Sequence, residues 1–313
     1  MIDRSRAPAP VKRAGRAVSR TFGRATSRWR ALPDFMLVGG NRCGTTALHR
    51  ALIEHPLVAP PVLHKGVNYF DVNYFRGPDW YAGHFPTRAD AQRRAGRSAG
   101  RPLVMEACGY YLDHPAAATR IRQDLPETKF VVMLRDPVER AHSAHRHNVA
   151  RGMEHRSFEE VIDLEPERNR GEAERMLADP TYESWAHRHG SPVRRGQYVE
   201  RLEEYFDLFG RDRVLVLFSE RFAVEPEPDF DEVLRFLDLP DFRPEAGFGR
   251  WNASPPADLA PATRRRLREH YRPYDERLAA LLGVELPWPN ADTDPALAEP
   301  AGRAPEAISQ ADG

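Results

Sequence analysis

Residues 39–46 have the composition and spacing of an anion-binding loop. They read GGNRCGTT and match the frame G-x-x-x-x-G-x-[ST], in which glycines let backbone N–H groups surround a phosphate. Thr45 stands where a nucleoside triphosphatase has the lysine that reaches the β- and γ-phosphates, and Arg42 brings a cation inside the loop instead. The loop is therefore expected to bind an oxyanion and to be a poor site for ATP or GTP hydrolysis. The competing interpretation is an ordinary strand–turn–helix whose glycines only permit close packing.

The segments around this loop alternate between strands and helices. Apolar runs typical of buried strands are followed by apolar residues at helical spacing. The predicted strands cover 35–40, 102–107, 129–137 and 213–220, and the predicted helices cover 45–55, 138–151, 197–209, 229–239 and 262–282, the last interrupted near Pro273. This alternation favours an α/β fold with a P-loop-like central parallel β-sheet and helices on both faces.

Two stretches between these elements are predicted to be less regular. Residues 87–101 are rich in Arg, Ala and Gly and are predicted to form a loop. Residues 148–196 are polar, with a helical pattern at 157–163 where Ser157 and Glu160 are spaced as a capping box. An excursion of this length between core strands either shapes a substrate cleft or is an insertion without a role.

The loop resembles the 5′-phosphosulfate-binding loop of sulfotransferases that use 3′-phosphoadenosine 5′-phosphosulfate (PAPS), especially the heparan-sulfate type and its bacterial relatives. Members of that family have Lys or Arg and then x-G-T-T after the first strand, and this chain reads R-C-G-T-T. Their second signature is an arginine at a strand end and a serine eight residues later, here Arg135 and Ser143 in FVVMLRDPVERAHSAHRH. The resemblance extends from about residue 35 to residue 283 and implies a PAPS-dependent sulfotransferase.

The resemblance also implies which residues bind the co-substrate. They are Arg42, Cys43, Gly44, Thr45, Thr46, Arg135, Ser143 and Arg250. Arg135 and Ser143 are expected at the 3′-phosphate, because an arginine fork matches phosphate oxygens and open α/β sheets bind ligands at the carboxyl ends of strands. Asp136 follows the arginine, where a nucleoside triphosphatase would end this strand with a Mg²⁺-binding aspartate. It is predicted to cap the next helix together with Pro137.

Sulfuryl transfer to a hydroxyl requires cations around the leaving group and benefits from a general base. The predicted catalytic residues are Arg42, Lys65 and Asp71. Lys65 is expected near the sulfonate, and the alternative for it is a surface lysine after a Pro-Pro turn. No metal is expected: His142, His145 and His147 form H-x-x-H-x-H, but no further ligand stands at a suitable spacing.

The segment expected to carry the general base departs from the family's motif. Relatives carry K-E-x-H-x-F-D where residues 65–71 read KGVNYFD, so Gly66 replaces the usual glutamate base and Asn68 replaces the histidine. Asp71 is the favoured base, and a structural aspartate that bonds a turn is the alternative. His64 or Glu106 are other candidates, and an acidic acceptor such as a phenol would need little help.

Charge is distributed unevenly along a chain whose formal net charge is zero. Residues 1–33 contain nine basic residues and one acid, whereas residues 284–313 contain six acids and one arginine. The overall balance argues against nucleic-acid coating, so no nucleic-acid partner is expected. Apolar residues in the basic arm recur at helical spacing, which indicates contact with an anionic membrane surface, a targeting segment, or a tail that is flexible or docked on its own domain. These residues are Val11, Val18, Phe22, Ala25, Trp29 and Leu32.

These observations predict three parts: a basic arm at 1–33, a sulfotransferase-like domain at 34–284 and a disordered acidic tail at 285–313. Two cysteines cannot form a disulfide framework and no apolar run reaches the roughly 18 residues of a membrane span, so a cytoplasmic location is predicted, with membrane-surface contact of the arm as a further expectation. The predicted function is sulfuryl transfer from PAPS to a hydroxyl of a glycan, glycoconjugate or small molecule. The alternatives are an inert nucleotide-binding relative of the same fold and a P-loop kinase or nucleoside triphosphatase.

Overall fold

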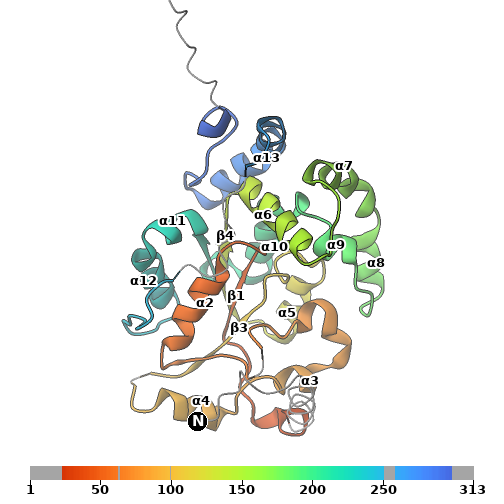
Figure 1. Ribbon diagram of the computed structural model, residues 1–313. Helices are drawn as coiled ribbons and strands as arrows, with labels where there is room; N and C mark the ends of the chain where they lie inside the picture. Colours follow the sequence, from red (N-terminus) through yellow and green to blue (C-terminus); the bar gives the residue numbers. More distant parts are fainter. Residues whose placement is uncertain (1–22, 63, 99, 250–257, 298–313) are drawn as a thin grey trace, which may run out of the picture.

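The computed structural model describes residues 23–62, 64–98, 100–249 and 258–297. A five-stranded β-sheet forms its centre (Figure 1). The strands are β1 (Phe35–Gly39), β2 (Val58–Ala59), β3 (Leu103–Ala107), β4 (Lys129–Leu134) and β5 (Val214–Phe218). Their order is β2-β3-β1-β4-β5 and every neighbouring pair is parallel, which confirms the predicted α/β fold.

Helices cover both faces of this sheet (Figure 1). They are α2 (Thr45–Glu54), α3 (Pro78–Ala82), α4 (Arg88–Ala95), α5 (Ala117–Asp124), α6 (Pro137–Ala150), α7 (Phe158–Arg168), α8 (Glu172–Ala178), α9 (Trp185–His189), α10 (Tyr198–Phe209), α11 (Ser219–Val224), α12 (Pro226–Phe236) and α13 (Pro261–Leu282). The capping box predicted at Ser157 and Glu160 is present at the start of α7, and the Asp136 side chain caps α6, with Pro137 in the first turn.

The core is divided by the sheet into two layers. Every residue of β1 is buried, and alternate side chains point to opposite faces. Met36 and Val38 pack in the layer that contains α5 and α10, whereas Phe35 and Leu37 pack in the layer that contains α2 and α12. Parallel strands buried on both faces are continuously apolar, which is why these strands were recognisable in the sequence.

Two predictions about local structure are wrong. Residues 87–101 are not a simple loop, because α4 lies within them, begins at a Thr87 cap and buries only two small residues, Ala91 and Ala95. A face made of alanines gives little apolar periodicity. Helix α13 is not interrupted at Pro273. Both Pro273 and Glu269 are exposed, so water can bond the Glu269 carbonyl oxygen that the proline leaves without a backbone donor.

The domain continues beyond residue 284, where the sequence predicted an acidic tail. Trp288 is 8% exposed, and its ring lies 5.6 Å from that of Phe218 at the end of β5. Asp294 is buried and binds Arg268 of α13 at 2.8 Å. One tryptophan and the ion pairs of Asp292 and Asp294 with arginines of α13 therefore hold residues 285–297 on the domain, although their composition is typical of a tail. Residues 298–313 lie outside the described residues.

At the other end, the part of the basic arm that is described also contacts the domain. Arg30 is buried and its guanidinium donates to the carbonyl oxygen of Phe85, and Arg30 pairs with Thr87 in an isolated β-bridge. Residues 1–22, which hold three of the six residues of the predicted amphipathic pattern, lie outside the described residues.

Candidate functional site

The loop between β1 and α2 has a backbone suited to holding an anion. Arg42 and Gly44 both have a φ of 77°, with Cys43 at negative φ between them. Such alternation turns successive N–H groups toward one point. Gly39 has no room for a side chain, because a Cβ there would contact the carbonyl oxygen of Met133. The loop leads into the N-terminus of α2, where unbonded N–H groups and the helix dipole favour negative charge.

Cys43 contributes to this loop through its backbone. Its side chain is fully buried, and its Sγ lies 3.9 Å from the Tyr198 hydroxyl. Burial raises the pKa of the Cys43 thiol to about 11, with Arg140 acting in the opposite direction. The thiol is therefore neutral and packs beneath the loop, whereas Gly44 of the same loop is exposed to solvent.

Three of the predicted co-substrate residues meet at this loop from segments that are far apart in the sequence. Arg42 Nε donates to Ser143 Oγ at 3.0 Å, and Arg135 Nη1 donates to the Arg42 carbonyl oxygen at 3.0 Å. Tyr198 OH in turn donates to the Arg135 carbonyl oxygen at 2.8 Å. Because β1 and β4 are parallel neighbours, their carboxyl ends bring the loop and Arg135 to the same edge of the sheet.

The site concentrates positive charge. Burial lowers the pKa of Arg42, and the guanidinium groups of Arg135 and Arg146 lower it further. Arg146 was not among the predicted site residues, although it lies three residues after Ser143 and so on the same face of α6. Like charges held together in a partly buried site favour a multiply charged anion, which relieves their repulsion.

Lys65 lies beside the loop and supplies an ammonium group that the loop sequence lacks. Its Nζ donates to Thr45 Oγ1 at 3.3 Å, and Thr45 is the residue at the lysine position of the P-loop frame. Burial lowers the pKa of Lys65 to about 8. Burial also lowers the pKa of the neighbouring His49 to about 4, helped by the Lys65 charge, so this imidazole is neutral. A cation from another segment thus occupies the neighbourhood of the missing loop lysine.

The segment that carries Lys65 has no space for the glutamate of the resembling family. A Cβ at Gly66 would lie 2.5 Å from the carbonyl oxygen of Ala107, closer than two such atoms can approach. The backbones are further joined by a hydrogen bond of 3.2 Å from Ala107 N to the Lys65 carbonyl oxygen. Gly66 is therefore required by this close approach to β3.

Glu106 is enclosed under this segment. It is 0% exposed and accepts hydrogen bonds from Val67 N at 2.7 Å, Tyr81 OH at 2.7 Å and Tyr111 OH at 2.8 Å. Burial raises the pKa of Glu106 to about 7, although these three donors act in the opposite direction. With its oxygens occupied and no exposed surface, Glu106 holds the segment after Lys65 in place and cannot meet an acceptor in this conformation.

Asp71 lies on a π-helical turn, η3 (Tyr69–Asn73), and is 1% exposed. Its Oδ2 accepts from Asn68 Nδ2 at 2.7 Å and from Cys108 Sγ at 3.6 Å. Burial raises the pKa of Asp71, and the hydrogen bond from Asn68 lowers it in part. Asn68 itself has a φ of 56°, a conformation that asparagine tolerates better than most residues. The residue at the family's histidine position thus covers the predicted base.

A basic residue that the sequence analysis missed lies close to this carboxyl. Arg188 belongs to α9 in the 148–196 excursion, and its guanidinium carbon lies 5.2 Å from the centre of the Tyr110 ring. Burial lowers the pKa of Arg188, but the carboxylates of Asp71 and Glu183 outweigh burial and raise it. No sequence signal distinguished Arg188 from the many other arginines.

The remaining predicted features are placed as follows. His142 and His145 pack on the ring of Phe158, each with centroids 5.3 Å apart, and His145 Nε2 bonds the Arg156 carbonyl oxygen. Within the described ranges, no group of three or more His, Cys, Asp or Glu side chains is arranged to hold a metal ion. Arg250 lies outside the described residues.

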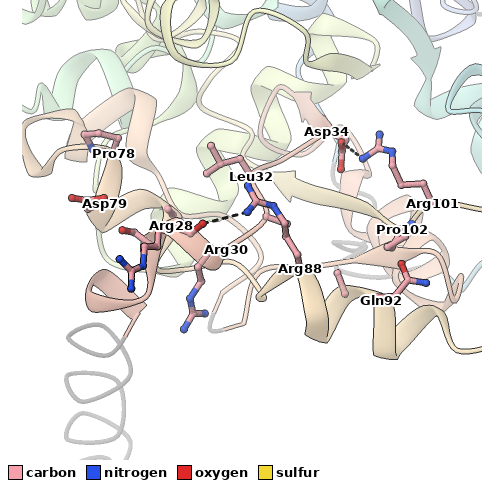
Figure 2. Close-up of a pocket in the computed structure, with 14 residues that line it drawn as sticks. Arg28, Arg30, Leu32, Asp34, Pro78, Asp79, Arg88, Gln92, Arg101 and Pro102 are labelled. Carbon is pink, nitrogen blue, oxygen red and sulfur yellow. Dashed lines mark hydrogen bonds and ion pairs between the residues drawn. The ribbon is translucent and has the colours of Figure 1, made fainter.

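A separate pocket of about 670 Å³ lies away from these residues, between α3, α4 and the turn η2 (Ser27–Trp29) (Figure 2). Asp34 directly precedes β1 and Arg101 lies just before β3, so this pocket is at the amino ends of the strands, opposite the loop. Two interactions join residues of its lining: Arg101 binds Asp34 at 2.7 Å and Arg88 donates to the Arg28 carbonyl oxygen at 3.2 Å (Figure 2).

The fold and the anion site together define a class of protein, and sequence comparison identifies the same class. A family model described as the sulfotransferase domain matches residues 32–246, more than half of the chain. The chain therefore belongs to the sulfotransferase family, as the resemblance in the loop and the Arg135–Ser143 motif predicted.

Individual relatives agree with this assignment. A sulfotransferase from Alicyclobacillus acidocaldarius, known from a crystal structure, is 30% identical in sequence and superimposes with a TM-score of 0.61. The match covers 82% of this chain and 98% of that chain. The human heparan sulfate glucosamine 3-O-sulfotransferase 6 is 27% identical over 282 residues, 83% of this chain and 74% of that protein. The bifunctional heparan sulfate N-deacetylase/N-sulfotransferase 1 of Caenorhabditis elegans is 23% identical over 222 residues, 68% of this chain. The chain spans only 23% of that larger relative.

The comparisons also correct the predicted location. The membrane-associated sulfotransferase kil1 of Dictyostelium discoideum is 24% identical over 330 residues, 83% of this chain and 67% of that protein. The prediction of a cytoplasmic protein is therefore wrong as an inference from composition, because a similar chain is found at membranes. Among the described residues, none of the helices is both long and apolar enough to span a bilayer.

Proposed function

We propose that this chain transfers a sulfuryl group from PAPS to a hydroxyl group, and that the acceptor is a carbohydrate or a glycoconjugate. The observation that carries the proposal is the convergence of Arg42, Arg135, Ser143 and Lys65 on a P-loop-like loop without its lysine. Two anionic groups at opposite ends of one nucleotide explain why cations gather on both sides of this loop.

The proposed binding mode places one anionic group of the nucleotide at the loop and the other at Arg135 and Ser143. The 5′-phosphosulfate lies on the loop and the N-terminus of α2, where Thr45 and Thr46 begin the helix. The 3′-phosphate lies at Arg135 and Ser143, and Arg42 stands between the two anionic groups. The chain's own features fit such a ligand, because Arg42 is already crowded by like charges that a dianion would neutralise.

The proposed reaction is an in-line displacement at sulfur. The acceptor oxygen forms a bond to sulfur as the bond between sulfur and the phosphate oxygen breaks, and adenosine 3′,5′-bisphosphate leaves with the bonding electrons. Negative charge develops on that phosphate oxygen, and the ammonium group of Lys65 beside Thr45 is placed to stabilise it. With a pKa of about 8, Lys65 is mostly protonated at pH 7, as this role requires.

Asp71 is the proposed base that takes the acceptor proton. The raised pKa of its buried carboxyl makes it a stronger base than an exposed aspartate. The Asn68 amide binds the carboxyl oxygen that would receive the proton, so an acceptor hydroxyl would have to replace Asn68 as the donor to Oδ2. Arg188 of α9 would then keep the carboxyl ionised between turnovers.

A carbohydrate acceptor is supported by the relatives: one is named for 3-O-sulfation of heparan sulfate glucosamine and another for N-sulfation of heparan sulfate. A kinase or nucleoside triphosphatase is disfavoured by Asp136. Its carboxylate caps α6 and binds Arg268 through both oxygens, at 2.8 and 2.6 Å, so it is not available to a magnesium ion. An inert nucleotide-binding relative of the same fold would have the same anion site and would differ only in lacking a working base.

The experiment has a binding part and a transfer part. The full chain is titrated with adenosine 3′,5′-bisphosphate by calorimetry, and the expected dissociation constant is micromolar or lower. Arg135→Ala should weaken binding by at least tenfold, since it removes a charged partner of the 3′-phosphate. Absence of binding by the wild type would reject the proposal.

The transfer part uses ³⁵S-labelled PAPS and a mixture of desulfated glycosaminoglycans, other glycans and simple phenols. Label in glycans that is lost with Asp71→Asn but not with Glu200→Gln, an exposed carboxylate, supports the enzyme and its base. Nucleotide binding without transfer to any acceptor favours the inert relative, and label in phenols alone contradicts the carbohydrate acceptor.

A further inference from the structure

One arginine beneath the phosphate loop lacks the partners that buried arginines normally have. Arg140 on α6 is 0% exposed. Its Nη2 donates to the Pro192 carbonyl oxygen, but Nε and Nη1 have no hydrogen-bond partner among the described residues. The Tyr271 hydroxyl is a close neighbour that donates its own proton to Val193 at 2.8 Å, and its approach to Arg140 falls short of hydrogen-bond geometry.

Two other buried arginines are paired with carboxylates, and two more, Arg30 and Arg120, donate to backbone carbonyl oxygens. Arg268 binds Asp136 at 2.6 Å and Arg195 binds Asp113 at 2.6 Å, and in each pair both side chains are at most 7% exposed. No carboxylate of the described residues lies within ion-pair distance of Arg140. The carboxylates of Asp113 and Glu165 interact with Arg140 from beyond that distance, so its charge is incompletely offset and an anion on the loop is expected to offset it further.

The position of Arg140 indicates where that counter-charge binds. A Cβ placed at Gly40 would lie 3.1 Å from Arg140 Cδ and 3.9 Å from Nε, so the side chain runs directly under the first turn of the loop. Arg140 also acts on the thiol of Cys43, which fills the space beneath the same loop. Arg140 therefore lies directly beneath the backbone of the loop, where a buried charge is less screened than it would be in water.

We propose that Arg140 is a buried positioning residue of the phosphate loop, which favours an anion at the 5′ end of the nucleotide without touching it. The inference rests on the proposed function, because it assigns the loop to the 5′-phosphosulfate and not to the 3′-phosphate. The incompletely offset charge of Arg140 makes the empty loop less favourable, and a bound 5′-phosphate reduces that cost. Nucleotide binding and folding are thereby coupled through one side chain.

The test compares ligands that carry a phosphate at one end only. Wild type, Arg140→Met and Arg140→Lys are titrated with adenosine 5′-monophosphate, adenosine 3′-monophosphate and adenosine 3′,5′-bisphosphate by calorimetry. Arg140→Met should weaken the two ligands with a 5′-phosphate by at least tenfold and leave the 3′-monophosphate within twofold. Arg140→Lys, which keeps the charge, should stay within about threefold of wild type for all three.

Ser143→Ala is the matched control from the same helix, and it should show the opposite pattern. It should weaken the two ligands with a 3′-phosphate and leave the 5′-monophosphate unchanged. Urea unfolding without ligand separates an electrostatic from a structural role, because Arg140→Met should unfold at the same urea concentration as wild type or a higher one. Equal losses for all three ligands, unchanged affinities, or a methionine variant that does not fold would each overturn the proposal.

Failure of the proposed function gives a different result. If wild type binds no adenine nucleotide, inorganic pyrophosphate replaces it as the probe, and the rise in melting temperature that it causes is measured for wild type and Arg140→Met. A rise in wild type that the methionine variant lacks keeps Arg140 as the partner of a loop anion. Equal rises, or none in either protein, reject the inference about Arg140 as well.

Discussion

Asp136→Ala should destabilise the folded protein strongly, because one carboxylate completes two structures at once. Its Oδ1 accepts hydrogen bonds from Val138 N at 2.9 Å and Glu139 N at 3.4 Å and so caps α6. Both oxygens also bind Arg268, and the side chains of this pair are 7% and 2% exposed. The substitution therefore removes a helix cap and leaves a buried guanidinium with fewer counter-charges.

The two losses can be estimated separately. Removal of an N-cap costs about 1 kcal/mol. Removal of one partner of a buried ion pair costs about 3–5 kcal/mol, and the lower value applies because Arg268 keeps its 2.8 Å contact with Asp294. The expected decrease in the free energy of unfolding is therefore about 4 kcal/mol. Asp136→Asn keeps a capping oxygen and should lose about 1 kcal/mol less than the alanine variant.

The assay is equilibrium urea unfolding, with Asp163→Ala as the matched control. Asp163 binds Arg266 at 2.6 Å, but these side chains are 63% and 54% exposed, so that substitution should cost less than about 1 kcal/mol. The double variant Asp136→Ala/Arg268→Met should be less destabilised than the sum of its two single variants. A decrease below about 1 kcal/mol for Asp136→Ala, or equal decreases for Asp136→Ala and Asp163→Ala, would refute the reasoning.

Three further predictions concern Glu106, Gly66 and Trp288. Burial raises the pKa of Glu106 from an ordinary 4.5 to about 7, so its ionisation in the folded state is unfavourable and stability should fall as the pH rises from about 4.5 to 7. The loss is about 3 kcal/mol, and urea unfolding of Glu106→Gln should lack this part of the pH dependence; an unchanged pH profile contradicts it. Gly66→Ala forces a Cβ against the Ala107 carbonyl oxygen and should lower the free energy of unfolding by about 2 kcal/mol in urea. A variant that unfolds at the same urea concentration as wild type would contradict this prediction. Trp288→Ala should lower the free energy of unfolding, measured by thermal unfolding, by about 3–5 kcal/mol. An unchanged melting temperature would mean that this segment is a loose tail.

The sequence was sufficient for those parts of the fold that depend on local pattern. The strands β1, β3 and β4 are buried over all or almost all of their length, and β5 is buried at three of its five residues. The capping residues Ser157 and Asp136 act within three residues of themselves, so their roles were readable from spacing alone. Helix α4 escaped detection because its buried face consists of two alanines.

The chemistry of the site was predictable only where a motif carries it. The loop and the Arg135–Ser143 spacing belong to a pattern that many sequences share, and the structure brings these residues together. Arg188 approaches Asp71 from more than a hundred residues away, and nothing in its local sequence marks it. Lys65 was a candidate by scarcity and resemblance, but its contact with Thr45 depends on how two separate segments pack.

The contact between Gly66 and the Ala107 carbonyl oxygen also limits how this chain can change over evolutionary time. A single substitution that restored the family's glutamate at this position would meet a backbone atom before its carboxyl reached any acceptor. The segment would first have to move away from β3, which means losing the hydrogen bond from Val67 to Glu106. A larger residue at position 66 is therefore expected together with a change in how this segment packs on β3. Lineages that share this close packing are expected to retain glycine and to vary instead at positions around Asp71.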